Sequence, residues 1–189
     1  MSIFEFISVM VSIVLGLSFA QLLLTVSRFA RNSSRVKAYL PHTIWLANLV
    51  LWHFLMWWSF WDYRNVEWNY GRFLVITLEP LLLFLTTSIA APKKFDTELI
   101  DNQENFFEVR HWFFLSFIAL QVLSMVDGQL VFGSEPLWVV YRIPQLVVLT
   151  VMVLGFLMPR HWAQQLSAWT VFLALLLASY FRFLPAAFE

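Results

Sequence analysis

Apolar runs of bilayer-crossing length dominate this chain and constrain its fold more than any other feature. Six such runs cover about 3–29, 41–61, 73–91, 110–130, 137–158 and 162–184. A helix needs about 20 residues to cross roughly 30 Å of hydrocarbon, and each run is close to that length. The polar segments between them are too short to form a soluble domain. The sequence therefore predicts an all-α integral membrane protein in which residues 1–189 form one transmembrane domain, a six-helix bundle.

Composition and motif content exclude several classes of function. The formal net charge is zero, so the chain lacks the basic field that attracts nucleic acid. Cysteine is absent, which excludes disulfides and thiolate metal sites. The sequence also lacks an HExxH motif, a serine elbow, a phosphate-binding loop and a paired-carboxylate signature. We therefore expect no enzymatic activity and no metal site.

Lysine and arginine are distributed unevenly between the two sets of loops, and this bias predicts the orientation. Short loops rich in these residues stay in the cytoplasm. One side carries Arg28, Arg31, Arg35, Lys37, Lys93, Lys94, Arg110 and Arg160, and the other carries Arg64, Arg72 and Arg182. We therefore expect both termini on the non-cytoplasmic side, which for a bacterial inner membrane is the periplasm.

The second, fourth and sixth apolar runs begin alike, with PHTIWL, RHWFFLS and RHWAQQLS. Their histidines, His42, His111 and His161, all lie on the predicted cytoplasmic side. The similarity has two interpretations: three helical hairpins in tandem, as in transporters with internal repeats, or interfacial anchoring by His, Arg and Trp. We prefer anchoring because the intervals between the three histidines are unequal.

Among the ionisable side chains of the predicted spans, Glu5, Glu79, Asp127 and Arg142 all lie in the outer half. Each costs about 2.5–3.5 kcal/mol on insertion scales and so needs a reason. A proline directly follows Glu79 and another lies two positions after Arg142, and each frees a backbone carbonyl that lipid cannot satisfy. We expect a polar cavity in the outer leaflet that binds a proton, an ion or a small ligand. Two alternatives stay open: a buried Glu79–Arg142 or Asp127–Arg142 pair that fixes helix register, and anchoring at lipid headgroups.

A histidine and several tryptophans form a second candidate region. His53 lies near mid-membrane in LVLWHFLMWW, where histidine can relay a proton, ligate haem or bond to a neighbouring helix. The other histidines lie at the interface, which disfavours haem held between two of them. Trp57 and Trp61 suit an aromatic belt at the outer interface, or a stacking wall for a flat ligand such as a quinone or carotenoid. Trp52 is too deep for the belt and keeps the ligand alternative open.

Small residues recur every fourth position along the first span: Ser8, Ser12, Gly16 and Ala20. Small side chains let two helix backbones approach closely in lipid, where dispersion and hydrogen bonding drive helix association. We expect this stripe to pack within the bundle or at a subunit contact. Glu5 lies on the same face, so we expect its carboxylate to point inward at the other buried charges.

Several segments resemble a widespread family of small bacterial membrane proteins. They are EFISVMVSIVLGLSFAQLL, YLPHTIWL after a basic loop, a WW pair, a W-x-Y-G-R-F-L turn, LEPLLLFL and RHWFF, all within residues 3–118. The resemblance implies a bacterial inner-membrane location. It supplies no activity, cofactor or catalytic residue, and the last two runs match only as apolar spans.

The sequence as a whole predicts a non-enzymatic homo-oligomer in the lipid bilayer, with an outward-facing polar cavity that binds or conducts a small ion or proton. Glu5 and Glu79 are the predicted titrating groups, Arg142 their counter-charge and His53 a deeper relay. Two alternatives remain. One is a quinone-, haem- or pigment-binding subunit with its ligand against Trp52, His53 and Trp57; the other is a scaffolding subunit of a larger membrane complex.

Overall fold

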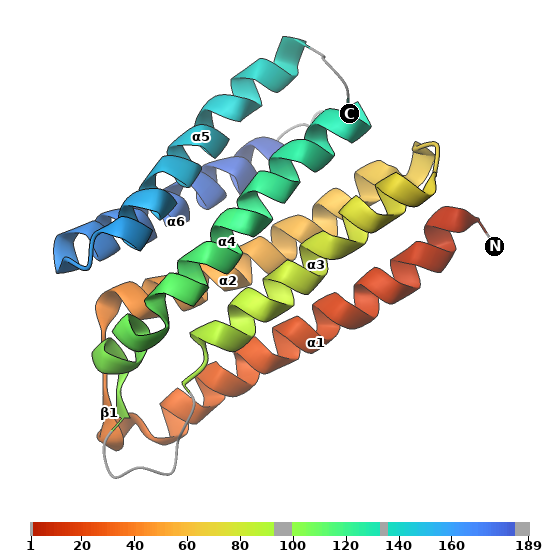
Figure 1. The fold of residues 1–189 in the computed structure, drawn as a ribbon. Coiled ribbons are helices and arrows are strands. Elements are labelled where there is room, and N and C mark those ends of the chain that lie inside the picture. Colours follow the sequence, from red (N-terminus) through yellow and green to blue (C-terminus); the bar gives the residue numbers. More distant parts are fainter. Residues whose placement is uncertain (1, 93–99, 133–135, 184–189) are drawn as a thin grey trace.

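A computed structural model describes residues 2–92, 100–132 and 136–183 and shows an almost entirely helical protein (Figure 1). The helices are α1 (Ile3–Arg31), α2 (Leu40–Ser59), α3 (Tyr70–Ala90), α4 (Asn102–Phe132), α5 (Pro136–Leu157) and α6 (His161–Phe183). Short 3₁₀-helices, η1 (Ser33–Arg35) and η2 (Phe60–Asn65), follow α1 and α2, and two-residue strands β1 (Val36–Lys37) and β2 (Ile100–Asp101) precede α2 and α4. The predicted all-α fold is confirmed.

Among the described residues, four helices are long and apolar enough to cross a membrane. These are α1, α3, α4 as far as Gly128, and α6 as far as Tyr180. The described apolar part of α5, Arg142–Leu157, is shorter. The α2 helix contains four Trp, two His, one Asn and one Pro, which lower its hydropathy. The chain thus has several helices of spanning length, and the full count of six spans stays a prediction.

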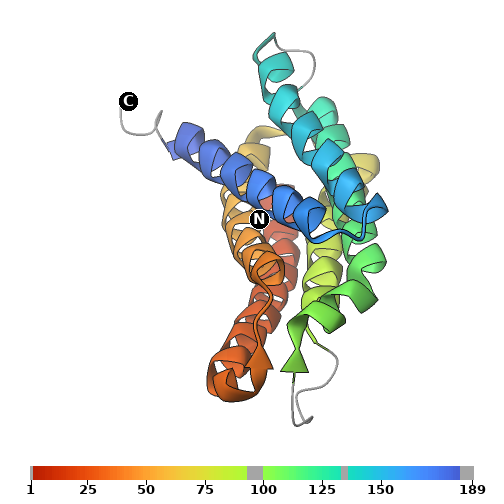
Figure 2. The same cartoon turned by 90° about the vertical axis from the view of Figure 1, so that its left-hand side faces the viewer.

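The first four helices run side by side, with α1 at one edge and the α5–α6 pair at the other (Figures 1 and 2). The α3–α4 interface is the most extensive, α1 packs more on α3 than on α2, and α2 packs mainly on α6. Three independent hairpins in tandem would favour contacts within α1–α2, which are sparse. The predicted hairpin arrangement is therefore not confirmed.

Aromatic rings of α2 and α4 fill the centre of the bundle. The indole of Trp45 is fully buried and lies 5.2 Å from Phe113, 5.4 Å from Phe114 and 5.5 Å from Phe117, centroid to centroid. All three contacts are edge-on, the geometry that aromatic quadrupoles favour. This cluster fixes α4 against α2. It therefore also sets the position of the residues on the last turns of α4.

Local sequence signals explain where the helices begin. Ser2 and Glu5 form a capping box at the start of α1, and the Asn69 side chain accepts a hydrogen bond from the Arg72 amide at the start of α3. Asp101 accepts from the amides of Gln103 and Glu104 at the start of α4. The N-terminus, η2 and the last turns of α4 lie at one end of the bundle, the η2 end, and β1 lies at the other, the β1 end (Figure 1).

Candidate functional site

Two buried carboxylic acids lie between α3 and α4, toward the η2 end of the bundle. Glu79, on α3 beside Pro80, is 9% exposed, and Asp127, on α4, is 3% exposed. They lie close enough for their charges to interact. Glu79 therefore faces the α3–α4 interface rather than lipid, which is the placement that a costly buried acid requires.

A tyrosine from η2 completes this acid cluster, which we define as Tyr63, Glu79 and Asp127. The Tyr63 hydroxyl donates a hydrogen bond to Oδ2 of Asp127, and both carboxylates act on Tyr63 electrostatically. Sequence reasoning did not find Tyr63. Its position in the sequence was the one available signal, because it follows the WW pair and Trp61 in the turn that leads toward α3. A tyrosine buried there needs a hydrogen-bond partner.

Each acid of the cluster has one buried oxygen without a hydrogen-bond partner among the described residues, Oε1 of Glu79 and Oδ1 of Asp127. A buried polar atom without a partner costs about 1–3 kcal/mol, and more if it is charged. Such oxygens can accept a proton, or a donor brought by a bound species. The chemistry that this arrangement offers is therefore reversible binding of a proton or a small cation.

The predicted counter-charge lies on a different layer of the bundle. Arg142 is half-buried on α5, a helix that packs mainly on α4 and α6. Glu79 interacts electrostatically with Asp127, and Asp127 accepts a hydrogen bond from Tyr63. The acid cluster is thus formed by α3, α4 and η2, and the predicted pairing of Glu79 with Arg142 stays a prediction.

Glu5 takes a different position from the one expected. Its carboxylate accepts a hydrogen bond of 2.8 Å from the Ser2 amide, and the residue is exposed at the end of α1. An acid in the first turn stabilises a helix by satisfying free amides and by favourable interaction with the helix dipole. Within the described chain Glu5 is a capping residue and does not point into the acid cluster.

The small-residue stripe of α1 also lies off the buried face. Gly16 and Ala20 are exposed, and Ser8 and Ser12 are only half-buried. The buried face of α1 consists of Ile7, Val11, Leu15, Ser18, Leu22 and Thr25. These positions precede the stripe by one residue in the first turns, a rotation of about 100°. Burial inside a single bundle is thus not the role of the stripe, and a subunit contact remains the prediction for it.

His53 is buried at the junction of three helices. Its Nδ1 lies 2.7 Å from the Leu49 carbonyl oxygen and its Nε2 2.7 Å from the Ser18 hydroxyl of α1. The Ser18 hydroxyl is also hydrogen-bonded to that of Thr87 on α3, at 3.3 Å. A carbonyl only accepts, so Nδ1 carries a hydrogen. Both ring nitrogens are engaged, and ligation of haem iron at Nε2 would require the bond with Ser18 to break.

The predicted aromatic wall is divided by the structure. Trp52 packs edge-on against Phe117 in the core, at 4.9 Å. Trp57 and Trp61 are exposed and line a groove of about 510 Å³ between the first half of α1 and the end of α2 with η2. The groove is lined by Phe4, Ser8, Val11, Ser12, Leu15, Trp57, Trp58, Phe60, Trp61 and Asp62. At this groove α1 and α2 do not close on each other, and α1 packs mainly on α3.

No family model, curated protein or solved structure matches this chain. The resemblance drawn from the sequence therefore stays a prediction. Among the described residues, no group of three or more His, Asp or Glu side chains is placed to hold a metal ion.

Proposed function

We propose that this chain is a polytopic membrane protein that takes up and releases a proton at the buried Glu79–Asp127 pair. The observation that carries the proposal is the pair itself. It consists of two carboxyl groups on the most closely packed helices, each with one buried oxygen that lacks a hydrogen-bond partner among the described residues.

The energetics of the pair favour a bound proton. Two ionised carboxylates side by side in an apolar interior repel each other, and each has also lost its hydration. One proton on the pair removes the repulsion and supplies a donor for a second oxygen. The Tyr63 hydroxyl, which donates to Asp127, favours Asp127 as the ionised member and Glu79 as the protonated one.

The His53–Ser18–Thr87 chain supports a second proton-binding point deeper in the bundle. Hydroxyl hydrogens can turn to either neighbour, so the direction of this chain can reverse when His53 gains or loses a proton. Thr87 lies about 12 Å from Glu79 along α3, at 1.5 Å per residue. Transfer between the two points requires water or side-chain movement between them.

The setting of this activity follows the expectations from sequence. We place the chain in a bacterial inner membrane with both termini in the periplasm, so that the acid cluster lies in the outer leaflet. We assign the exposed small residues of α1, Gly16 and Ala20, to a contact with a second copy.

Proton flux into liposomes tests the proposal directly. The protein is reconstituted with a pH-sensitive dye inside, and a pH step is applied outside. We expect Glu79→Gln and Asp127→Asn to abolish the pH-dependent flux because each removes one acid of the pair. Glu67→Gln is the matched control, since Glu67 is an exposed acid near the same end of the bundle. Wild-type flux in Glu79→Gln would contradict the proposal.

The groove supports a second candidate function, binding of a flat apolar ligand such as a quinone or a pigment. A volume of about 510 Å³ lies within the range of ligand pockets. Trp57, Trp58 and Trp61 give it an aromatic wall, and Arg64 already stacks on Trp61 at 5.2 Å. The ligand would lie against this wall and not beside Trp52 and His53, which are packed in the core.

The visible spectrum and the solvent extract of the purified protein test this second function. We expect an absorption band or an extractable quinone, lost in Trp57→Ala and Trp61→Ala and kept in Trp112→Ala, whose exposed ring lies on α4. A colourless protein without quinone rejects it. A chain that also fails the flux test is best explained as the scaffolding subunit of a larger complex.

A further inference from the structure

The turn between α5 and α6 crosses α4 toward the β1 end of the bundle and brings basic side chains together. Arg110 of α4 donates a hydrogen bond of 2.9 Å to the carbonyl oxygen of Phe156, at the end of α5. The His111 ring packs edge-on against the Phe156 ring. One turn earlier on α4, Phe107 packs edge-on against His161, the first residue of α6. These contacts hold the turn across the face of α4 that carries His111.

The basic corner formed in this way consists of Arg110, His111, Arg160 and His161. Arg110 is 4% exposed, whereas the other three side chains are exposed. In the part of the chain that the structure describes, no acid forms an ion pair with either arginine. A buried cation normally has a counter-charge, and the negative end of the α5 dipole supplies only about half a charge to Arg110. The basic corner therefore has a net positive charge.

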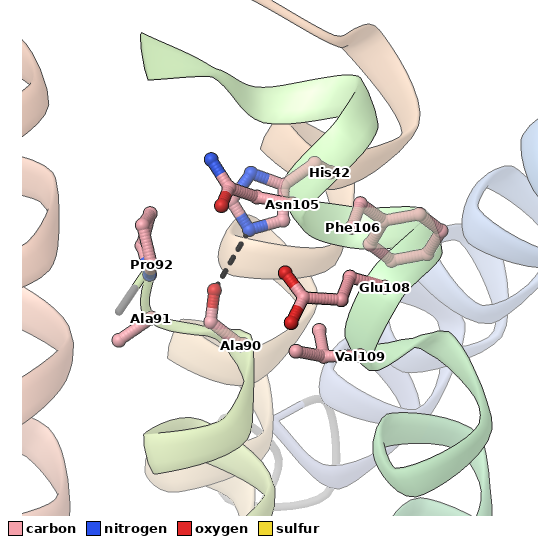
Figure 3. Close-up of a pocket in the computed structure, with 8 residues that line it drawn as sticks. All are labelled: His42, Ala90, Ala91, Pro92, Asn105, Phe106, Glu108 and Val109. Carbon is pink, nitrogen blue, oxygen red and sulfur yellow. Dashed lines mark hydrogen bonds between the residues drawn. The ribbon is translucent and has the colours of Figure 1, made fainter. Parts of the chain in front are cut away.

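The nearest acids along α4 are engaged elsewhere. Glu108 lines a small pocket between α2, α4 and the end of α3, and its carboxylate points toward Ala90 (Figure 3). Glu104 acts electrostatically on Lys37 of β1. Because neither carboxylate faces the basic corner, an anion from outside the chain can supply the missing counter-charge.

The exposed groups of the basic corner suit the oxygens of a phosphate. Nη2 of Arg110 lies 2.9 Å from Nε2 of His111, and a guanidinium only donates. His111 therefore accepts at Nε2 and carries its hydrogen on Nδ1, which makes its exposed ring a donor. Arg160 adds a guanidinium, whose planar fork matches two oxygens of a phosphate group. The positive end of the α6 dipole begins beside Arg160 and adds to the attraction.

Exposed tryptophans place the basic corner at the level of lipid headgroups. Trp112 follows His111 and Trp162 follows His161, and both indoles are exposed. Tryptophan gathers at the interface between hydrocarbon and water. Leu157, the last residue of α5, is exposed as well and offers an apolar surface to acyl chains. We place this end in the cytoplasm, where anionic lipids make the membrane surface negative.

We propose that the basic corner binds the phosphodiester headgroup of an anionic phospholipid in the cytoplasmic leaflet. Arg160 and Nδ1–H of His111 donate to the phosphate oxygens, and Trp112 and Trp162 flank the glycerol and the upper acyl chains. The negative charge then lies one imidazole ring away from the buried guanidinium of Arg110. The lipid thus joins α4 to the α5–α6 pair, a role that goes beyond the proposed proton uptake and does not depend on it.

Native mass spectrometry of the detergent-extracted protein mixed with phosphatidylglycerol tests the site. Phosphatidylcholine is the reference lipid, because it has the same phosphodiester but no net charge. We expect tighter retention of phosphatidylglycerol, weakened by about fivefold in Arg160→Gln. His111→Phe keeps a ring against Phe156 but removes the donor, and should weaken retention too. Arg35→Gln is the matched control, since Arg35 is an exposed arginine of η1 at the same end of the bundle.

Two results would overturn the inference: equal retention of the two lipids, or an equal loss in Arg160→Gln and Arg35→Gln. Arg160→Lys keeps the charge and should retain more lipid than Arg160→Gln. Inorganic phosphate at the concentration of the lipid should leave the adduct intact, and displacement would identify a soluble anion as the ligand and reject a lipid. The assay measures no proton flux, so its failure leaves the proposed function standing.

Discussion

The hydroxyl of Tyr63 in η2 donates a hydrogen bond to Oδ2 of Asp127 in the last turns of α4. This bond joins the short connection between α2 and α3 to a helix far along the chain. Because it holds Oδ2 of Asp127, this bond fixes the orientation of Asp127 relative to Glu79.

Tyr63→Phe removes this donor and leaves Asp127 buried with both oxygens unsatisfied. We expect the free energy of unfolding to fall by about 1–3 kcal/mol, the cost of an unsatisfied buried acceptor. Unfolding in mixed micelles with increasing SDS measures the change. Tyr70→Phe is the control because Tyr70 is 74% exposed, and an equal loss in both variants would contradict the role of Tyr63.

Gly155 marks a close approach between α5, α4 and α6. A Cβ there would lie 2.5 Å from Cζ of Phe114 and 2.9 Å from Oγ of Ser167. We therefore expect Gly155→Ala to lower the midpoint of thermal unfolding, with a cost of about 1–3 kcal/mol for overpacking. Gly71→Ala is the matched control, since a Cβ at that position would meet only Oδ1 of Asn69 at 3.4 Å, an ordinary van der Waals contact. It should gain up to about 1 kcal/mol of helix propensity, and equal effects would contradict the packing.

Gln164 of α6 satisfies free carbonyls at the end of α5. Its Nε2 donates to Gly155 at 2.9 Å and to Met158 at 2.8 Å, and Arg110 donates to Gly155 as well. Gln164→Leu should cost about 1–3 kcal/mol because the Met158 carbonyl loses its side-chain donor. Limited proteolysis after Leu157 reports the loosened turn. Gln165→Leu, an exposed neighbour, should be cleaved at the wild-type rate.

The pairing of β1 with β2 should depend on pH through Lys37 and Asp101. Their side chains form an ion pair of 2.8 Å, and the hydrogen bond from Lys37, with those from the Glu104 and Gln103 amides, lowers the pKa of Asp101. Because the pKa of Asp101 is lower in the folded state, its ionised side chain stabilises the fold at pH values above its unfolded-state pKa. This stabilisation is lost as the pH falls through the folded-state pKa. The bond to Asp101 raises the pKa of Lys37, so its contribution is lost as pH rises through that value.

Hydrogen-exchange protection of the β1 and β2 amides measures this dependence. We expect protection to be highest between the two titrations and to decrease on the acidic side. Lys37→Gln should weaken the acidic decrease but not remove it, since Asp101 also caps α4. An unchanged acid profile in Lys37→Gln would contradict the assignment to the ion pair.

Most helix boundaries could be predicted because bilayer length and capping residues determine them. The bounds of α1, α2, α3, α5 and α6 lie within about three residues of the predicted spans. The start of α4 was missed: it begins at Asn102, not near Arg110. The segment between carries several acidic residues, but Asp101 caps it and Phe106 extends the core face of α4.

The acid pair could be predicted in part. Depth in the span and the neighbouring proline pointed to Glu79, and burial cost pointed to Asp127. The partner Tyr63 could not be predicted, because its contact depends on how η2 folds over α4. The predicted inward position of Glu5 was wrong. A carboxylate in the first turn of a helix can either cap the helix or point into a site, and sequence spacing does not distinguish these two roles.

Infrared spectroscopy of the carboxyl carbonyl stretch tests the central claim most directly. At neutral pH the wild-type protein should show the band of a protonated carboxylic acid in an apolar environment, shifted in heavy water. The band should disappear in the double variant Glu79→Gln, Asp127→Asn and persist in Glu67→Gln. A wild-type spectrum without this band, or a double variant that retains it, would contradict a proton held by the buried pair.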